Sequence, residues 1–153
     1  MPRIVSDSTM LVSAFLAPRG AAAAVLAQVR AGRVALAVSD AILAETARVL
    51  LTYPHIRQRY HYPDTAVQEF CDGLTQVGEL MTDFPPLSGV CRDPNDDMVL
   101  ACALAATAAY LVTRDKDLLV LQQYEGIAII TPEAFLAVLR TTPQSVCHVR
   151  RLR

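Results

Sequence analysis

The sequence predicts an α/β fold with a mainly parallel sheet, for two reasons. Short apolar runs alternate with stretches of helical periodicity along most of its 153 residues. Acidic residues also follow two of the apolar runs directly, and an open parallel sheet binds its ligands beyond the carboxyl ends of its strands. A chain of this length suits one domain with a substantial core. We expect that domain to span residues 1–140 and an arginine-bearing, disordered tail to follow at 141–153.

The first half of the chain contains a set of recognisable boundaries. The apolar pair Ile4-Val5 indicates a first strand, and Pro18-Arg19-Gly20 separates the two helices that follow it. Ser39-Asp40 offers an N-cap to a further helix. In order, we expect a strand at 3–6, helices at 11–15 and 21–31, a strand at 34–38, a helix at 41–52, a connector or short helix at 53–63, and a helix at 64–78.

The second half begins with a loop, indicated by Pro85-Pro86 and Gly89. Asp93-Pro94 starts a helix, because proline is tolerated in the first helical turn. The apolar run at 110–112 indicates the next strand. In order, we expect a loop at 84–92, a helix at 96–108, a strand at 109–113, a helical turn at 116–122, a strand at 127–130 and a helix at 132–140.

Composition excludes several classes of protein. The hydrophobic fraction is 53%, but no apolar run approaches the roughly 20 residues of a membrane span. The first residues lack the layout of a secretory signal. The four cysteines are scattered, without a Cys-x-x-Cys pair, which argues against a zinc site and against a disulfide framework. We therefore expect a cytoplasmic protein with reduced thiols and no membrane contact.

The charge is close to neutral but unevenly distributed. The net charge is −1; residues 1–139 hold ten basic and fifteen acidic residues, and residues 140–153 hold four arginines and no acid. This balance excludes the strongly basic class of nucleic-acid-binding proteins. It does not exclude an RNA or DNA substrate, because metal ions bound by the acids would restore local positive charge.

Four carboxylates stand where a fold of this class would bring them together. Asp7 and Asp115 follow strands directly, so both should point into the crevice at the sheet edge. Glu45 shares a helix stripe with Ile42 and Val49, and Asp97 shares one with Ala101 and Leu104, so both should face the protein. Carboxylates held by rigid elements provide the hard oxygen ligands that Mg²⁺ or Mn²⁺ requires.

Simpler interpretations of single residues stay open at this point. Asp40 and Asp96 fit ordinary helix caps or first-turn acids, and Asp117 fits a cap of the turn after the strand. The segment 57–62 mixes arginine and aromatic residues, which suits either a packed connector or a surface that stacks on single-stranded RNA. The tail arginines suit either a solvated terminus or a contact with RNA or an acidic partner.

Segments of the chain resemble the PIN-domain ribonucleases, in particular their VapC-like toxin branch. The opening strand and turn at 5–13, the acidic helix at 41–50, and above all the segments 93–101 and 110–119 carry the resemblance. It implies a three-layer α/β/α sandwich that cleaves RNA with Mg²⁺ or Mn²⁺ and leaves 5′-phosphate and 3′-hydroxyl ends. It also implies a protein antitoxin as partner and a homodimer.

The resemblance carries over to particular residues. Asp7, Glu45, Asp97 and Asp115 match the family's acidic quartet, Asp117 matches a supporting position, and Asp93 and Asp96 fall in an acid-rich loop as further candidate metal ligands. Ser8 and Thr113 are candidates to orient carboxylates or a phosphate, and Arg114 and Lys116 are candidate contacts to the RNA backbone. The chain departs from the family at Thr9, where asparagine is usual. A threonine lacks the two amide donors, so we expect weaker orientation of Asp7.

Two other functions compete with the nuclease. The first is a non-catalytic PIN scaffold that binds RNA or a protein, which Thr9 suggests. The second is a magnesium-dependent phosphoryl-transfer domain, either a receiver or a haloacid-dehalogenase-like phosphatase. The phosphatase needs a second aspartate at position 9, which is threonine. A receiver needs a lysine at the end of a late strand, but the one lysine, Lys116, lies between two aspartates.

Overall fold

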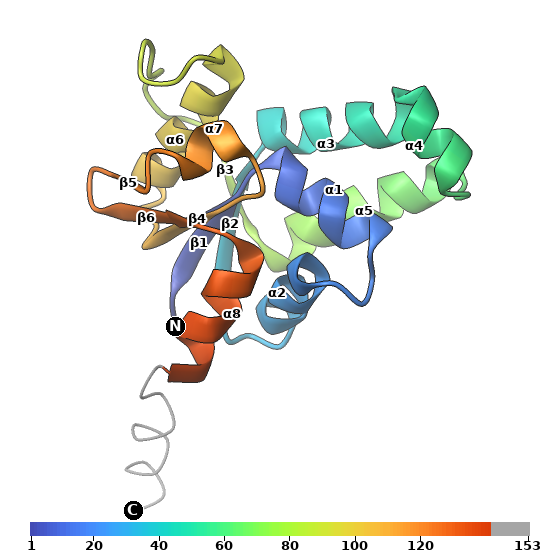
Figure 1. The fold of residues 1–153 in the computed structure, drawn as a ribbon, viewed down its shortest axis with the longest axis horizontal. Helices are drawn as coiled ribbons and strands as arrows, with labels where there is room; N and C mark the ends of the chain where they lie inside the picture. Colours follow the sequence, from blue (N-terminus) through green and yellow to red (C-terminus); the bar gives the residue numbers. More distant parts are fainter. Residues whose placement is uncertain (142–153) are drawn as a thin grey trace, which may run out of the picture.

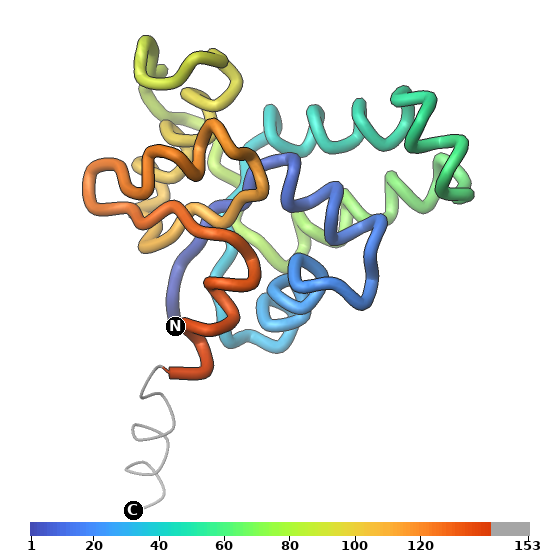
Figure 2. Tube along the Cα trace, viewed as in Figure 1, coloured from blue at the N-terminus to red at the C-terminus, as the bar shows by residue number. Residues whose placement is uncertain are grey.

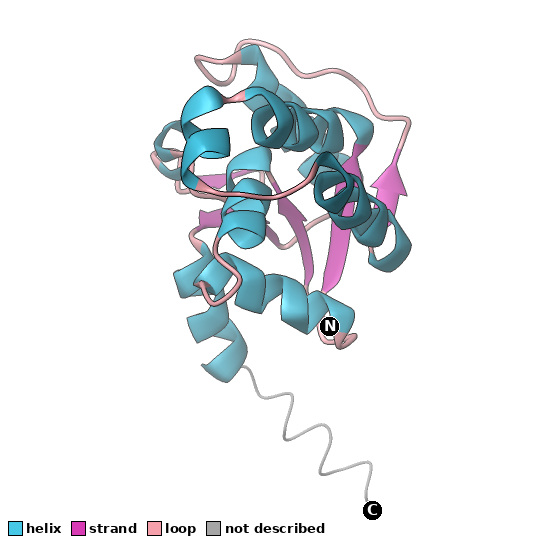
Figure 3. Ribbon diagram, turned by 90° about the vertical axis from the view of Figure 1, so that its right-hand side faces the viewer, coloured by secondary structure: helices cyan, strands magenta, loops and turns pink. Residues whose placement is uncertain are grey.

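The computed structural model describes residues 1–141 and is an α/β fold in which helices cover both faces of a six-stranded sheet (Figure 1, Figure 3). The strands are β1 (Arg3–Ser6), β2 (Ala35–Ser39), β3 (Glu79–Met81), β4 (Tyr110–Val112), β5 (Gln123–Tyr124) and β6 (Ile127–Ile130). The helices are α1 (Ser8–Leu16), α2 (Ala21–Arg30), α3 (Asp40–Thr52), α4 (Pro54–Arg59), α5 (Asp64–Val77), α6 (Pro94–Ala105), α7 (Lys116–Leu119) and α8 (Pro132–Thr141). The predicted fold class is confirmed.

The strand order creates a binding crevice between β1 and β4. The order is β3-β2-β1-β4-β6-β5, and every neighbouring pair is parallel except β5 and β6. The chain leaves β1 towards β2 on one side, whereas it leaves β4 towards β6 on the other. Open α/β sheets bind ligands at such a switch point, beyond the carboxyl ends of the two strands.

The core lies on both faces of the sheet. Helix α6 contacts β1, β2 and β4, while α1, α2 and α8 pack against one another on the other face (Figure 1). Helices α3 and α5 continue this second layer towards β3. Fully buried side chains come from the strands and from both helical layers, including Val5, Leu111, Leu100 and Phe135.

The sequence analysis did not predict two short strands, β3 and β5. Strand β3 has three residues and begins with Glu79, so no apolar pattern marked it; pairing with β2 defines it. Strand β5 has two residues and forms a hairpin with β6. Glu125 and Gly126 form the tight turn of that hairpin with φ of 50° and 82°, as the common two-residue hairpin turn requires.

The connector at 53–63 contains α4 and packs against the body of the domain. The Tyr62 hydroxyl donates to the Leu50 carbonyl at 2.6 Å, and its ring meets Phe15 edge to face at 4.9 Å. The Arg57 guanidinium lies 4.8 Å from the Tyr62 ring and pairs with Asp64. These contacts favour the packed connector over an RNA-stacking surface.

Two further expectations concern cysteines and membranes. Cys71, Cys91 and Cys102 are free thiols, and burial raises the pKa of Cys102 to about 11. Within residues 1–141, no single helix is long and apolar enough to span a membrane. Helices α1 and α2 reach that length and apolar character only when taken together, and a sharp bend separates them. The predicted disordered tail lies outside the described residues, apart from Thr141.

We predict that Phe135→Ala destabilises the domain by about 3–5 kcal/mol, because it empties a fully buried site on α8. The Phe135 ring also meets Tyr110 of β4 at 5.3 Å. Urea unfolding of the two proteins measures the difference. Val120→Ala is the matched control, since Val120 is 74% exposed and should change the free energy of unfolding by less than about 0.5 kcal/mol. Equal effects of the two changes would contradict a core that includes α8.

Candidate metal centre

Three aspartates cap helices at the carboxyl end of the sheet. Asp7 follows β1 and accepts from the Met10 amide of α1 at 3.3 Å. Asp93 accepts from the Asn95 amide of α6 at 2.9 Å, and Asp115 accepts from the Asp117 amide of α7 at 2.9 Å. The chain direction reverses at each of these points, so the cap fixes where the carboxylate lies.

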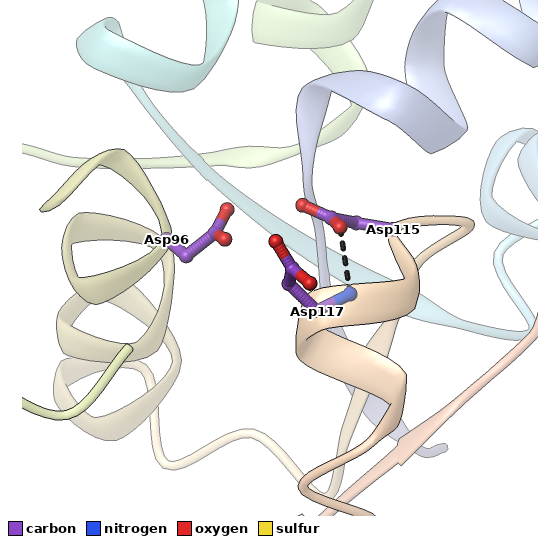
Figure 4. Close-up of side chains that lie close together, drawn as sticks. All are labelled: Asp96, Asp115 and Asp117. Carbon is purple, nitrogen blue, oxygen red and sulfur yellow. Dashed lines mark hydrogen bonds between the residues drawn. The ribbon is translucent and has the colours of Figure 1, made fainter. Parts of the chain in front are cut away.

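Asp96, Asp115 and Asp117 converge on one point. One carboxylate oxygen from each lies within 4.8 Å of the others. Figure 4 shows the three side chains close together, Asp96 on α6 and the other two at the start of α7. Asp96 comes from the first turn of α6 and is only 7% exposed, whereas Asp115 and Asp117 come from the start of α7. The segments that carry them are distant in sequence but lie side by side (Figure 2).

A cavity of about 180 Å³ opens between these elements. Five carboxylates line it, together with Ser8, Thr9 and Asn95; the acidic residues are Asp7, Glu45, Asp93, Asp96 and Asp115. Pockets that enclose drug-sized molecules measure roughly 300–1,000 Å³. The cavity therefore suits an ion with water or a phosphate group, and a larger substrate would have to present its reacting group from outside.

Asp7 is the most deeply buried of these carboxylates and is only 3% exposed. Burial raises the pKa of Asp7 to about 6, although hydrogen bonds from Thr9, Thr113 and the Met10 amide oppose that rise. The Thr9 hydroxyl lies 2.9 Å from both carboxylate oxygens. Thr9 therefore orients the Asp7 carboxylate with its one hydroxyl hydrogen, whereas the asparagine expected at this position would have two amide hydrogens to donate.

Asp96 has a raised affinity for protons as well. Its burial, together with the negative charge of Asp115 and a proton shared with that residue, raises the pKa of Asp96 to about 7. Within residues 1–141, the four ion pairs use Glu45, Asp64, Glu79 and Glu133, so no basic side chain neutralises the aspartates of this cluster. Among the described residues, the cluster is therefore an anionic site without a basic counter-ion.

Asp97, which we expected to belong to the acidic quartet, has a different hydrogen-bond partner from the aspartates of the cluster. Its Oδ1 accepts from the Cys91 amide at 2.7 Å, and it does not line the cavity. Because Asp93 caps α6, Asp96 occupies the third helical position, and its side chain leans back towards the helix N-terminus and the cavity. In the sequence, Asp93-Pro94 indicates where α6 begins, and the start of the helix determines which of its residues face the cavity.

The other predicted residues divide between the cavity and the surface. Glu45 lines the cavity but does not face the core; Arg48 holds it in a bidentate pair at 2.8 and 2.9 Å and lowers the pKa of its carboxyl. Thr113 is buried beside Asp7, and Ser8 lines the cavity. Lys116 is exposed at the start of α7. Arg114, a predicted RNA contact, bonds instead to Glu133 and Ser13.

We predict that the metal-free protein loses stability between pH 5 and pH 8. The pKa of Asp7 is about 6 in the folded chain and near 3.8 when unfolded, so folding favours the protonated form. This contribution is present at low pH and disappears as the pH rises through 6, a loss on the order of 1 kcal/mol from Asp7 alone. Urea titrations in EDTA measure it. In Asp7→Asn the loss should shrink, and an unchanged pH dependence would contradict the burial of an ionisable Asp7.

A second prediction separates Asp96 from Asp97. Asp96→Asn should leave metal-free stability equal or higher, because it removes a repelling charge, and should weaken the rise in melting temperature caused by millimolar Mn²⁺. In the wild type that stabilisation is about 2.7 kcal/mol at 100 times the Kd. Asp97→Asn should lower metal-free stability by about 1–2 kcal/mol, because it weakens a partly buried hydrogen bond to the Cys91 amide, and keep the Mn²⁺ response. Thermal denaturation of both variants decides, and the reverse pattern would restore Asp97 to the cluster.

Comparisons with known proteins identify a family and a shared fold. A family model described as PIN domain matches residues 3–117. The solved VapBC2 complex from Rickettsia felis, bound to a DNA fragment from its promoter, shares the fold with a TM-score of 0.55 and 16% identity, over 83% of this chain and 96% of that chain. The RRP44 PIN domain of T. brucei gives a TM-score of 0.47 and 14% identity over 97% and 86% of the two chains. The sequence matches no curated protein.

PIN domains are typically metal-dependent nucleases, and the acidic cluster described above is consistent with a divalent metal site. The family model covers well over half of the chain, including β1, α3 with Glu45, the start of α6 with Asp96, and the start of α7. The chain therefore belongs to the PIN domain family.

Proposed function

We propose that this protein is an endoribonuclease that hydrolyses RNA phosphodiester bonds with the help of Mg²⁺ or Mn²⁺. One observation carries the proposal. Two buried carboxylates, Asp7 after β1 and Asp96 of α6, meet the half-buried Asp115 of the β4–α7 connection at a cavity, and no basic side chain of the described residues pairs with them. Nothing in the stability of the domain requires this arrangement, since like charges at close range repel.

The residues fit a divalent cation by their chemistry. Asp96, Asp115 and Asp117 offer oxygens within 4.8 Å of one another, and Asp7 and Asp93 line the same cavity. All are hard oxygen donors, the ligand type that Mg²⁺ and Mn²⁺ prefer. We propose Asp7, Asp96 and Asp115 as the principal ligands. A bound ion would lower the pKa of its water and neutralise charge on a phosphate.

The chain's own residues orient these groups. The hydroxyls of Thr9 and Thr113 hold Asp7, and the Thr113 hydroxyl also accepts from the Asp115 amide at 2.9 Å. Glu45 lies at the cavity wall with Arg48 beside it, where its carboxylate is suited to position a water molecule. We therefore propose Asp7, Glu45, Asp96 and Asp115 as the catalytic set and give Asp97 a structural role.

The biological role that fits best is the toxin of a toxin–antitoxin pair. The support is the resemblance of the sequence to the VapC-like branch, together with the structural similarity to the VapBC2 complex. On this proposal the partner is a protein antitoxin, the substrate is RNA, and the chain acts as a homodimer in the cytoplasm. Copurification of the chain with the product of a neighbouring gene would test the partner.

We predict that purified protein cleaves a labelled, partly single-stranded RNA in Mg²⁺ or Mn²⁺ and not in EDTA. Asp7→Asn and Asp96→Asn should each lower the rate at least about 100-fold, since each removes a charged oxygen ligand. Denaturing electrophoresis of the products measures the rate. Val120→Ala, an exposed change outside the site, is a matched preparation that controls for contaminating nuclease and should keep the wild-type activity.

The outcomes separate the competing functions. Metal-dependent cleavage that both aspartate variants lose supports the nuclease. A folded protein that binds Mn²⁺ but cleaves nothing points to the non-catalytic scaffold. Incubation with a small phosphodonor followed by intact mass analysis tests the phosphoryl-transfer alternative, which requires a phosphoprotein or turnover of the donor.

A further inference from the structure

Arg114 joins three parts of the molecule beside the candidate metal centre. It lies between Thr113 and Asp115, in the segment that leaves β4. Its Nε donates to the Ser13 hydroxyl of α1 at 3.0 Å. Its two terminal nitrogens donate to the two oxygens of Glu133 in α8, at 3.2 and 2.8 Å. A bidentate pair with a further bond to another helix fixes a guanidinium in both place and orientation.

The backbone of the same segment connects to the carboxylates. The Arg114 amide donates to the Thr9 hydroxyl at 3.1 Å, and that hydroxyl contacts both oxygens of Asp7. The Thr9 hydroxyl thus accepts from Arg114 with its oxygen and donates its single hydrogen to Asp7, so it links the two residues. The next amide, of Asp115, donates to the Thr113 hydroxyl. A shift of the backbone at Arg114 would therefore disturb both Asp7 and Asp115.

We propose that Arg114 is a positioning residue and Glu133 its anchor: their ion pair ties the segment 113–115 to α8 and thereby holds Asp7 and Asp115 in the geometry that a divalent cation requires. The ion is taken from the proposed function, but the constraint on the segment is independent of it. Arg114 acts through its neighbours and is not a contact to the RNA.

The bonding of Arg114 argues against a primary role in RNA binding. Three of its five N–H donors already have protein partners, Glu133 of α8 and Ser13 of α1, and neither partner lines the cavity. Its association with Glu133 also lowers the pKa of that carboxyl. An exposed ion pair contributes little to global stability, so its loss should loosen the site without unfolding the domain.

The experiment compares Arg114→Ala, Glu133→Ala, the double variant and the charge exchange R114E/E133R. Glu79→Ala is the matched control, because it removes a surface ion pair with Arg3 at the opposite end of the strands. Hydrogen exchange of the amides of residues 114, 115 and 117 is measured in EDTA. The Kd for Mn²⁺ alone is measured by calorimetry, and kcat and KM are measured with RNA.

We predict that both single variants accelerate amide exchange at these positions about 10-fold, raise the Mn²⁺ Kd about 3–10-fold and lower kcat with little change in KM. The double variant should add little to either single one, the charge exchange should recover part of the loss, and Glu79→Ala should match the wild type. Because exchange in EDTA needs neither metal nor RNA, it tests the constraint even if the wild type cleaves no RNA.

Two results would overturn the proposal. If Arg114→Ala raises KM while Glu133→Ala changes nothing, and the Mn²⁺ Kd stays constant, then Arg114 binds RNA. If amide exchange at 114, 115 and 117 is the same in all variants, the ion pair does not hold the segment. A wild type that shows neither Mn²⁺ binding nor cleavage would contradict the proposed nuclease and the role of Arg114 in cation binding. Amide exchange would still decide whether the ion pair holds the segment 113–115.

Discussion

Repulsion between carboxylates that have no basic partner within residues 1–141 is the constraint on which the rest of this structure depends. Asp7 and Asp96 are almost fully buried, and Asp115 and Asp117 lie close to Asp96. Burial and mutual repulsion raise the pKa values of Asp7 and Asp96, which means that the fold holds their charged forms at a cost. A folded domain is typically stable by only about 5–15 kcal/mol. Such a cluster therefore persists only because the rest of the fold holds its residues in place.

The fold keeps the carboxylates together despite their repulsion by holding Asp7, Asp96 and Asp115 on separate rigid elements. Strands β1 and β4 are neighbours at the centre of the sheet, and the chain leaves them in opposite directions, so Asp7 and Asp115 face one crevice. Helix α6 lies across both strands and brings its first turn, with Asp96, to the same point. The N-termini of α1 and α6 also lie here, capped by Asp7 and Asp93, and the partial positive charge of a helix N-terminus favours nearby anions. The centre is therefore assembled from elements that the core already holds together.

Much of this arrangement follows from the sequence, and what does not follow has definable causes. Asp7 and Asp115 were identifiable because apolar runs precede them directly, which places them at the carboxyl ends of strands. The choice between Asp96 and Asp97 depended on helix phase, since both are buried on α6 and apolar residues follow each at helical spacing. That phase is set by the cap at Asp93. Strand β3 and the role of Arg114 depend on partners far away in the sequence, at β2 and at Glu133, which no local pattern reveals.

Thr9 illustrates how such distant partners change the meaning of a substitution. Considered alone, a threonine in place of asparagine removes donors from Asp7 and suggests a weakened site. In the structure its hydroxyl accepts from the Arg114 amide and donates to Asp7, so Thr9 links Asp7 to a residue more than one hundred positions away. The Arg114 side chain is in turn held by α8 and α1. The orientation that an asparagine would supply through its own donors is thus distributed over three elements, and it depends on the packing of the whole sheet edge.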